Sequence, residues 1–154
     1  MLPLAIVGTL AEQGTDVALL DADPNATAHR WATQTHEGKA IEAHAEADAE
    51  RLAALLPSLA EQHTALVVDT AGFGNQAAAV AIAAADLVLV PVTPGEGDLI
   101  EAQRTVAYVN SLSRSTRRAI QVRVVANRIR RGTTLSRHVL TELETLGCRG
   151  CEPS

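Results

Sequence analysis

Short runs of consecutive apolar residues recur along the chain and alternate with longer segments in which apolar residues have helical spacing. An apolar run bounded by turn residues is typical of a strand buried on both faces, whereas helical spacing predicts a helix that covers a sheet. The predicted strands are the apolar runs 16–20, 64–68, 87–92 and 120–126 and the alternating segment 39–45. The predicted helices are 3–13, 26–35, 48–62, 75–85, 98–112 and 134–146. This order predicts an α/β fold, a three-layer sandwich around a mostly parallel sheet.

Three residues give local signals about the predicted helices. Gly14 directly follows the first predicted helix, where a glycine commonly ends a helix. Asp48 precedes the helix 48–62 as a suitable N-cap residue. Pro57 lies inside that same segment, and because proline removes a backbone donor we expect it to bend or break the helix.

Composition limits the class of protein. The chain has 154 residues, 47% of them apolar and only 2% aromatic, so one domain with an aliphatic core is expected. Asp86 divides the best apolar run, and all such runs fall short of the roughly 18 residues that a membrane span needs. No Lys or Arg precedes the apolar residues 2–10, so we expect no secretory signal and a cytoplasmic protein.

Charge is distributed unevenly. Residues 104–154 contain ten of the 13 basic side chains, all Arg, but only three of the 18 acidic ones. This distribution favours an acidic face and a separate face that attracts anions. An unevenly charged, solvated surface is the alternative.

Polar side chains follow the predicted strands at the point where each strand ends. They are Asp21, Asp23 and Asn25 after the first strand, Asp69 and Thr70 after 64–68, Thr93 after 87–92, and Asn127 and Arg128 after 120–126. The carboxyl ends of parallel strands meet at one edge of a sheet, where ligands bind in this fold class. Carboxylates from two strands there form an oxygen-rich site that suits Mg²⁺ and phosphate oxygens. Asp69 has the position of a Walker-B acid, and Gly72 and Gly74 behind it allow a phosphate to approach the backbone.

Four of these segments, in this order, resemble the ParA/MinD partitioning ATPases. They are VALLDADPNATAHRWA, ALVVDTAGFG, AADLVLVPVTPGEGDLIEA and VRVVANRI, and the similarity extends over residues 4–146. The resemblance implies a P-loop-NTPase-like (Rossmann-like) sheet and an ATPase that forms a homodimer around ATP and Mg²⁺. It also implies a cytoplasmic, nucleoid-associated role in positioning plasmids, chromosomes or other DNA with a ParB-like adaptor and non-specific DNA binding. Members that serve conjugative DNA transfer are similar too.

The resemblance also assigns roles to individual residues. Asp23 matches the catalytic acid that orients the attacking water and supports Mg²⁺, and Asp69 matches the Walker-B acid that holds Mg²⁺ through water. Asp21 belongs to the same motif as Asp23, and Asn25 replaces a usual Gln. Asn127 matches the residue that reads the adenine edge, and Thr93 matches the loop near the nucleotide.

One departure from the family is large. Its members begin with a strand and a Gly-rich loop that carries two lysines, whereas this sequence contains no GxxxxGK[ST] motif and its only lysine is Lys39. Backbone N–H groups and the lysine of that loop are the main anchor for a triphosphate, so we expect impaired ATP binding. In the family the absent strand lies between the strands that end here at Asp69 and Val92. Those two strands are expected either to close together or to leave a groove. The expected domain is therefore 1–147, truncated at both ends relative to the family, with a tail at 148–154.

The arginines and cysteines complete the candidate chemistry. Arg117, Arg118, Arg128, Arg130 and Arg131 are candidate contacts to DNA phosphates, although solubility alone also accounts for such a cluster. Cys148 and Cys151 lie in the tail without a second pair of ligands, so neither a zinc site nor a redox site is expected. Three functions stay open: a partition ATPase, a pseudo-ATPase that binds DNA or an adaptor without turnover, and, more distantly, a receiver-type phosphoacceptor domain.

Overall fold

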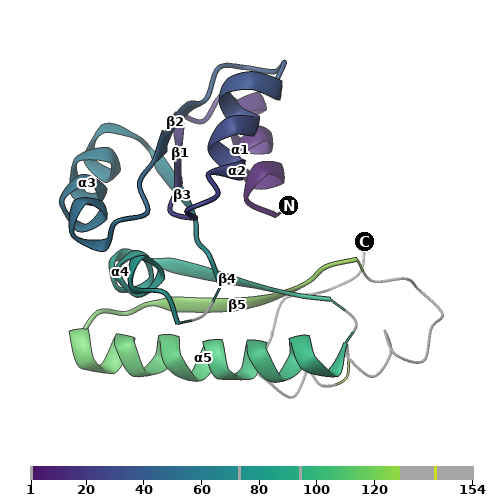
Figure 1. Cartoon of the computed structure of the whole chain (residues 1–154), viewed down its shortest axis with the longest axis vertical. Helices are drawn as coiled ribbons and strands as arrows, with labels where there is room; N and C mark the ends of the chain where they lie inside the picture. The colour runs from purple at the N-terminus through teal and green to yellow at the C-terminus, as the bar shows by residue number, and fades with distance from the viewer. Residues whose placement is uncertain (1, 73, 94, 129–140, 142–154) are drawn as a thin grey trace. The chain divides into compact units, whose positions relative to one another are not determined.

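Two parallel sheets form the framework of the chain, which divides after Ala84 into two compact units (Figure 1). The computed structural model describes residues 2–72, 74–93, 95–128 and 141, and the side chain of Glu96 is not among the described ones. Unit 1 contains α1 (Leu2–Glu12), β1 (Val17–Asp21), α2 (Thr27–Arg30), the π-helical turn η1 (Trp31–Thr35), β2 (Glu42–Ala45), α3 (Ala49–Gln62), β3 (Ala65–Asp69) and α4 (Gln76–Ala84). Unit 2 contains β4 (Leu87–Val92), α5 (Glu96–Thr116) and β5 (Gln121–Ala126).

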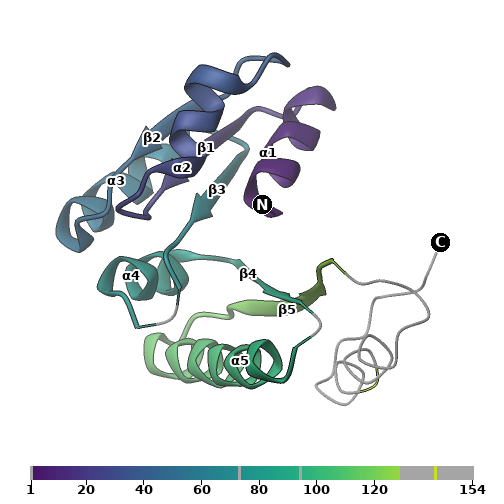
Figure 2. The same ribbon diagram turned by 45° about the vertical axis from the view of Figure 1, so that its right-hand side comes forward.

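Unit 1 is a three-layer sandwich. Its strands are parallel in the order β2-β1-β3, and every residue of the central strand β1 is buried. Because side chains alternate along a strand, Leu20 packs with α3 and α4 on one face of the sheet, and Leu19 packs with α1 and α2 on the other. Figures 1 and 2 show α3 and the pair α1 and α2 on opposite faces of these strands. The three-layer α/β prediction is confirmed.

Unit 2 consists of a two-stranded parallel sheet and the long helix α5. Val90, Val92 and Val124 face α5 and form an apolar core with Leu99 and Ala102 of that helix. Within the described part of the chain, β4 pairs with β5 alone. Pro91 is tolerated inside β4 because an edge strand does not need every backbone donor.

The described strands form one sheet in each unit. They pair as β2-β1-β3 in unit 1 and as β4-β5 in unit 2. β3 is only partly buried along its length although its sequence, ALVVD, is apolar, which is consistent with a strand paired on one side.

The structure confirms the predicted roles of Gly14 and Asp48 at helix ends, but it shows no break at Pro57. Gly14 ends α1 with a φ of 82°, and Asp48 caps α3 by accepting a 3.0 Å hydrogen bond from the backbone N–H of Arg51. Pro57 does not break the helix as expected, since α3 continues to Gln62. Pro57 is exposed, and the buried residues Leu52, Leu56 and Leu59 hold α3 on the core from its other side. This packing offsets the hydrogen bond that proline removes.

Other boundaries differ by a few residues. Strand 39–45 is shortened to β2, helix 26–35 becomes α2 followed by η1, and helix 98–112 is extended to α5. The predicted helix 134–146, the tail 148–154 and its cysteines lie outside the described residues, apart from Thr141. Among the described helices, none combines the length and apolar character needed to cross a membrane.

Candidate functional site

The acidic residues of unit 1 meet at the carboxyl edge of its sheet. Asp21 and Asp69 end β1 and β3 and are register partners in the parallel ladder. The backbone N–H of Ala22 also donates to the carbonyl oxygen of Asp69 over 2.7 Å, which ties the two strand ends together. The segments that end at Asp21 and Asp69 are well separated in the sequence, but they are neighbours in the fold.

Asp21 is committed to the fold of this edge. It is fully buried, with a relative exposure of 0%. Its Oδ1 accepts the backbone N–H of Asp23 over 3.0 Å, and its Oδ2 accepts the backbone N–H of His29 over 2.9 Å. A buried carboxylate with both oxygens hydrogen-bonded orders the loop after β1 and the start of α2.

Asp23 lies in that loop, nearer the surface. Its Oδ1 accepts both the backbone N–H of Asn25 at 2.8 Å and the side-chain Nδ2 of Asn25 at 2.9 Å. Ala26 follows with a left-handed φ of 48°, and Arg30 donates to the carbonyl oxygen of Asn25 over 2.6 Å. Asn25, which replaces the usual Gln, thus holds the carboxylate of Asp23 in a hydrogen-bonded turn.

The charged form of Asp69 is disfavoured. Burial raises its pKa above the ordinary value of 3.8, and the charges of Asp21 and Asp23 raise it further. The backbone N–H of Thr70 opposes this shift. Three carboxyl groups with mutual repulsion and a partly buried member favour the binding of a cation or a proton.

Carboxylate oxygens at this edge are of the kind that Mg²⁺ binds. Asp23 and Asp69 supply carboxylate oxygens, which Mg²⁺ takes together with water and phosphate oxygens when bound in a nucleotide site, where it neutralises charge on the phosphates. No group of three His, Cys, Asp or Glu side chains in the described residues is arranged to hold a metal ion by itself.

The remaining nucleotide candidates belong to unit 2. Thr93 and Asn127 follow β4 and β5, and the backbone N–H of Asn127 donates to the carbonyl oxygen of Val92 over 2.8 Å. Thr93 donates its hydroxyl to the carboxylate of Asp98 in the first turns of α5. The two candidates are thus neighbours at the carboxyl edge of their own sheet.

The described candidate arginines lie at the two ends of β5. Arg117 and Arg118 precede β5, whereas Arg128 follows it, so the length of the strand, about 20 Å for six residues, separates them. Arg118 donates to Asp86 over 3.1 Å, and Arg128 is exposed with a left-handed φ of 54°. Arg130 and Arg131 lie outside the described residues.

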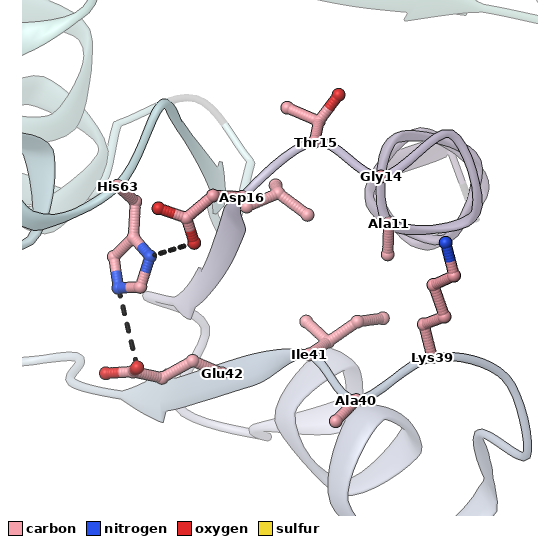
Figure 3. Close-up of a pocket in the computed structure, with 10 residues that line it drawn as sticks. Ala11, Gly14, Thr15, Asp16, Lys39, Ala40, Ile41, Glu42 and His63 are labelled. Carbon is pink, nitrogen blue, oxygen red and sulfur yellow. Dashed lines mark hydrogen bonds and ion pairs between the residues drawn. The ribbon is translucent and has the colours of Figure 1, made fainter.

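Lys39 is placed away from the acidic edge. It precedes β2, and its Nζ donates to the carbonyl oxygen of Glu12 over 3.2 Å, near the amino ends of the strands (Figure 3). The residues present therefore do not reproduce a lysine-bearing phosphate loop at Asp69.

Sequence reasoning missed a second cluster of charged residues at this amino edge. The imidazole of His63, which lies just before β3, is placed between the carboxylates of Asp16 and Glu42 (Figure 3). No sequence pattern signals this contact, because Asp16 and His63 are 47 positions apart. A further missed residue is Asn75, whose Oδ1 accepts the backbone N–H of Ala77 at the start of α4.

Solved structures share this fold. Apo McdA of Cyanthece matches with a TM-score of 0.77 and 16% identity over 96% of this chain and 76% of that one. A plasmid partition protein of Borrelia burgdorferi matches with a TM-score of 0.73 and 12% identity over 94% and 79%. Cobyrinic acid a,c-diamide synthase of Mycobacterium smegmatis, with bound ADP and magnesium, matches with a TM-score of 0.71 and 19% identity over 99% and 77%.

The sequence itself matches a family model. No curated protein matches the chain. The model of the VirC1 protein family matches residues 2–152, which is nearly the whole sequence. The resemblance to the ParA/MinD ATPases is thereby confirmed, and the chain belongs to the VirC1 family of ParA-like partitioning ATPases.

Proposed function

We propose that this chain is a DNA-partitioning protein of the ParA type that acts in the cytoplasm, and that as it stands it binds ATP weakly. The observation that carries the proposal is the position of Asp69 beside Asp21 and Asp23, with its pKa raised by burial and by both neighbouring charges. A site with excess negative charge at the carboxyl edge of a parallel sheet suits a magnesium nucleotide.

Each acidic residue has a separate role in this proposal. With a magnesium nucleotide bound, Asp69 and Asp23 would hold Mg²⁺ and Asp23 would also orient the attacking water, whereas Asp21 keeps the loop after β1 in place through its hydrogen bonds to Asp23 and His29. Thr93 and Asn127 are candidate nucleotide contacts within unit 2, at the carboxyl edge of the β4-β5 sheet. The magnesium and ADP bound by the Mycobacterium smegmatis synthase are consistent with such a site in this fold.

Weak binding follows from the missing phosphate anchor. The sequence contains no GxxxxGK[ST] motif, and Lys39 is bound to Glu12 near the amino ends of the strands. Each charge-assisted hydrogen bond absent from a triphosphate removes about 1.5–3 kcal/mol, so a few absent bonds weaken binding by orders of magnitude. This favours a pseudo-ATPase that binds partners without turnover over an active enzyme.

Isothermal titration with ATP and MgCl₂ tests both parts of the proposal. We expect a Kd weaker than about 1 mM for the chain as it stands. Micromolar binding that is lost in Asp69→Asn would support the acidic site but contradict weak binding. Micromolar binding that Asp69→Asn leaves unchanged would contradict the site itself.

Partners are proposed from the same family membership. A homodimer, a ParB-like adaptor and non-specific DNA are the partners that a partition protein requires, and the exposed Arg117 and Arg128 offer positive charge to DNA phosphates. The receiver-type alternative predicts that acetyl phosphate labels Asp69. We expect no labelling, because the lysine that such a site needs is absent after β5, where Asn127 and Arg128 stand.

A further inference from the structure

We propose that Asp16, His63 and Glu42 form a proton-dependent clasp that holds the edge strand β2 on the sheet of unit 1 and loosens when His63 loses its imidazolium proton. The clasp lies at the amino edge of the sheet, opposite the acidic edge, and plays no part in the proposed nucleotide site. It joins the segments that precede β1 and β3 to the first residue of β2.

The geometry favours two protons on the imidazole. Nδ1 of His63 lies 2.9 Å from Oδ1 of Asp16, and Nε2 lies 3.5 Å from Oε2 of Glu42 (Figure 3). Both ring nitrogens therefore face a carboxylate, and only the imidazolium carries an N–H on each. In the neutral form, one nitrogen lone pair faces a carboxylate oxygen, which is repulsive.

Because the side chain of His63 is largely buried, its contacts depend on whether the imidazole is protonated. The side chain of His63 is 10% exposed, whereas those of Asp16 and Glu42 are 60% and 51% exposed. Nε2 is buried without a hydrogen-bond partner in the described part of the chain, so its contact with Glu42 is electrostatic. A buried nitrogen without a hydrogen bond depends on the opposite charge beside it.

The charges that surround His63 raise the pKa of its imidazole. The hydrogen bond to Asp16 is the largest cause that raises the pKa of His63 above 6.5, and the charges of Asp16 and Glu42 add to it against the effect of burial. The pKa of Glu42 is lowered, first by its hydrogen bond to His44 and then by the charge of His63. Glu12 and Lys39 lie nearby but bind each other, through Lys39 N–H to Glu12 Oε1 and Nζ to the Glu12 carbonyl.

β2 is the element that would respond. It is a short edge strand that pairs with β1, and its residues are exposed or partly exposed. Glu42 crosses β1 to reach His63, so the clasp links the two outer strands of the sheet. A cavity of about 550 Å³ separates this contact from Lys39 and α1 (Figure 3). Ile41 and Ala43 pack on the apolar core of this face only as partly buried residues.

Amide hydrogen exchange of residues 43–45, measured by NMR at pH 6 and pH 8.5 and corrected for intrinsic exchange, tests the proposal. The raised pKa of the folded state stabilises the clasp below pH 6.5, and this stabilisation is lost as the pH rises through the folded-state pKa. The opening equilibrium of β2 should rise by about tenfold for each unit between the folded and unfolded pKa of His63. Equal protection at the two pH values would overturn the proposal.

Two variants distinguish the pH dependence caused by the clasp from general effects of pH on the protein. His63→Gln should abolish the pH dependence, whereas His36→Gln, whose ring contacts the Lys39 carbonyl and Trp31, should retain it. Retention in His63→Gln would overturn the proposal. Should that variant not fold, the titration of His63 in Asp16→Asn decides: a midpoint that falls toward 6.5 supports the clasp and an unchanged one contradicts it.

Discussion

Asp21 and Asp69 are paired in register at the ends of adjacent parallel strands, but their environments differ. Asp21 is fully buried and accepts backbone N–H groups with both oxygens, whereas Asp69 is partly exposed and has a raised pKa. One carboxylate therefore maintains the fold of the edge, and the other is available to a ligand. This difference leads to separate predictions for the two residues.

Replacement of Asp21 should mainly affect stability. Asp21→Ala leaves the backbone N–H groups of Asp23 and His29 without their acceptor, at a cost of about 2–4 kcal/mol. Asp69→Ala removes a repelled charge and should change the free energy of unfolding by less than about 1 kcal/mol. Urea denaturation followed by circular dichroism measures both, and equal losses would contradict the division of roles.

Asp69 should also make stability depend on pH. A carboxyl group whose folded-state pKa is raised binds more protons in the folded than in the unfolded protein, so stability falls as the pH rises from 3.8 through the folded-state pKa. Asp69→Asn should remove this component, while Asp48→Asn, which changes a helix cap, should retain it. Added MgCl₂ should lower the pKa of Asp69 in an NMR titration if a cation binds there. A pKa already at 3.8 in the absence of the salt would contradict the electrostatic argument.

Two glycines should respond in opposite directions to alanine. Gly74 has a φ of 98°, which an L side chain rarely adopts, so Gly74→Ala should destabilise the protein by about 1–2 kcal/mol. Gly97 lies in α5 with no atom near the position of an added Cβ, so Gly97→Ala should stabilise it by about 0.5–1 kcal/mol. Thermal unfolding of the two variants distinguishes these signs, and destabilisation by both would show that the argument from φ is wrong.

DNA binding should depend on salt through the exposed arginines. Arg128→Gln should reduce the slope of log K against log salt concentration by about 1, the effect of one phosphate contact. Arg118→Gln should have a smaller effect because Arg118 already forms an ion pair with Asp86. Arg51→Gln serves as a matched control, since Arg51 pairs with Glu46 in unit 1. Filter binding at several salt concentrations measures the slopes, and an unchanged slope for Arg128→Gln would exclude that residue.

The sequence predicts the positions of the strand ends well. The runs that end at Asp21 and Asp69 are apolar and bounded by turn residues, so the apolar pattern is enough to assign both carboxylates to one sheet edge. Which of them would be buried could not be predicted. That difference depends on where the loop after β1 directs its backbone N–H groups, which is a tertiary property.

Other features depend on contacts that no local pattern encodes. Pro57 is tolerated in α3 because three leucines pack against a core built from distant segments. His63 meets Asp16 and Glu42 only because three strands assemble side by side. Likewise, the arginines that are neighbours in the sequence are separated because β5 runs between them.

The division into two units has a practical consequence for spectroscopy. The chain has one tryptophan and one tyrosine. Trp31 belongs to η1 in unit 1, with its ring centroid 4.7 Å from that of His36, and Tyr108 belongs to α5 in unit 2. Excitation at the red edge of the indole band therefore gives an emission signal from unit 1 alone, because tyrosine does not absorb there. The unmodified protein thus carries an optical reporter that follows unit 1 without a contribution from unit 2.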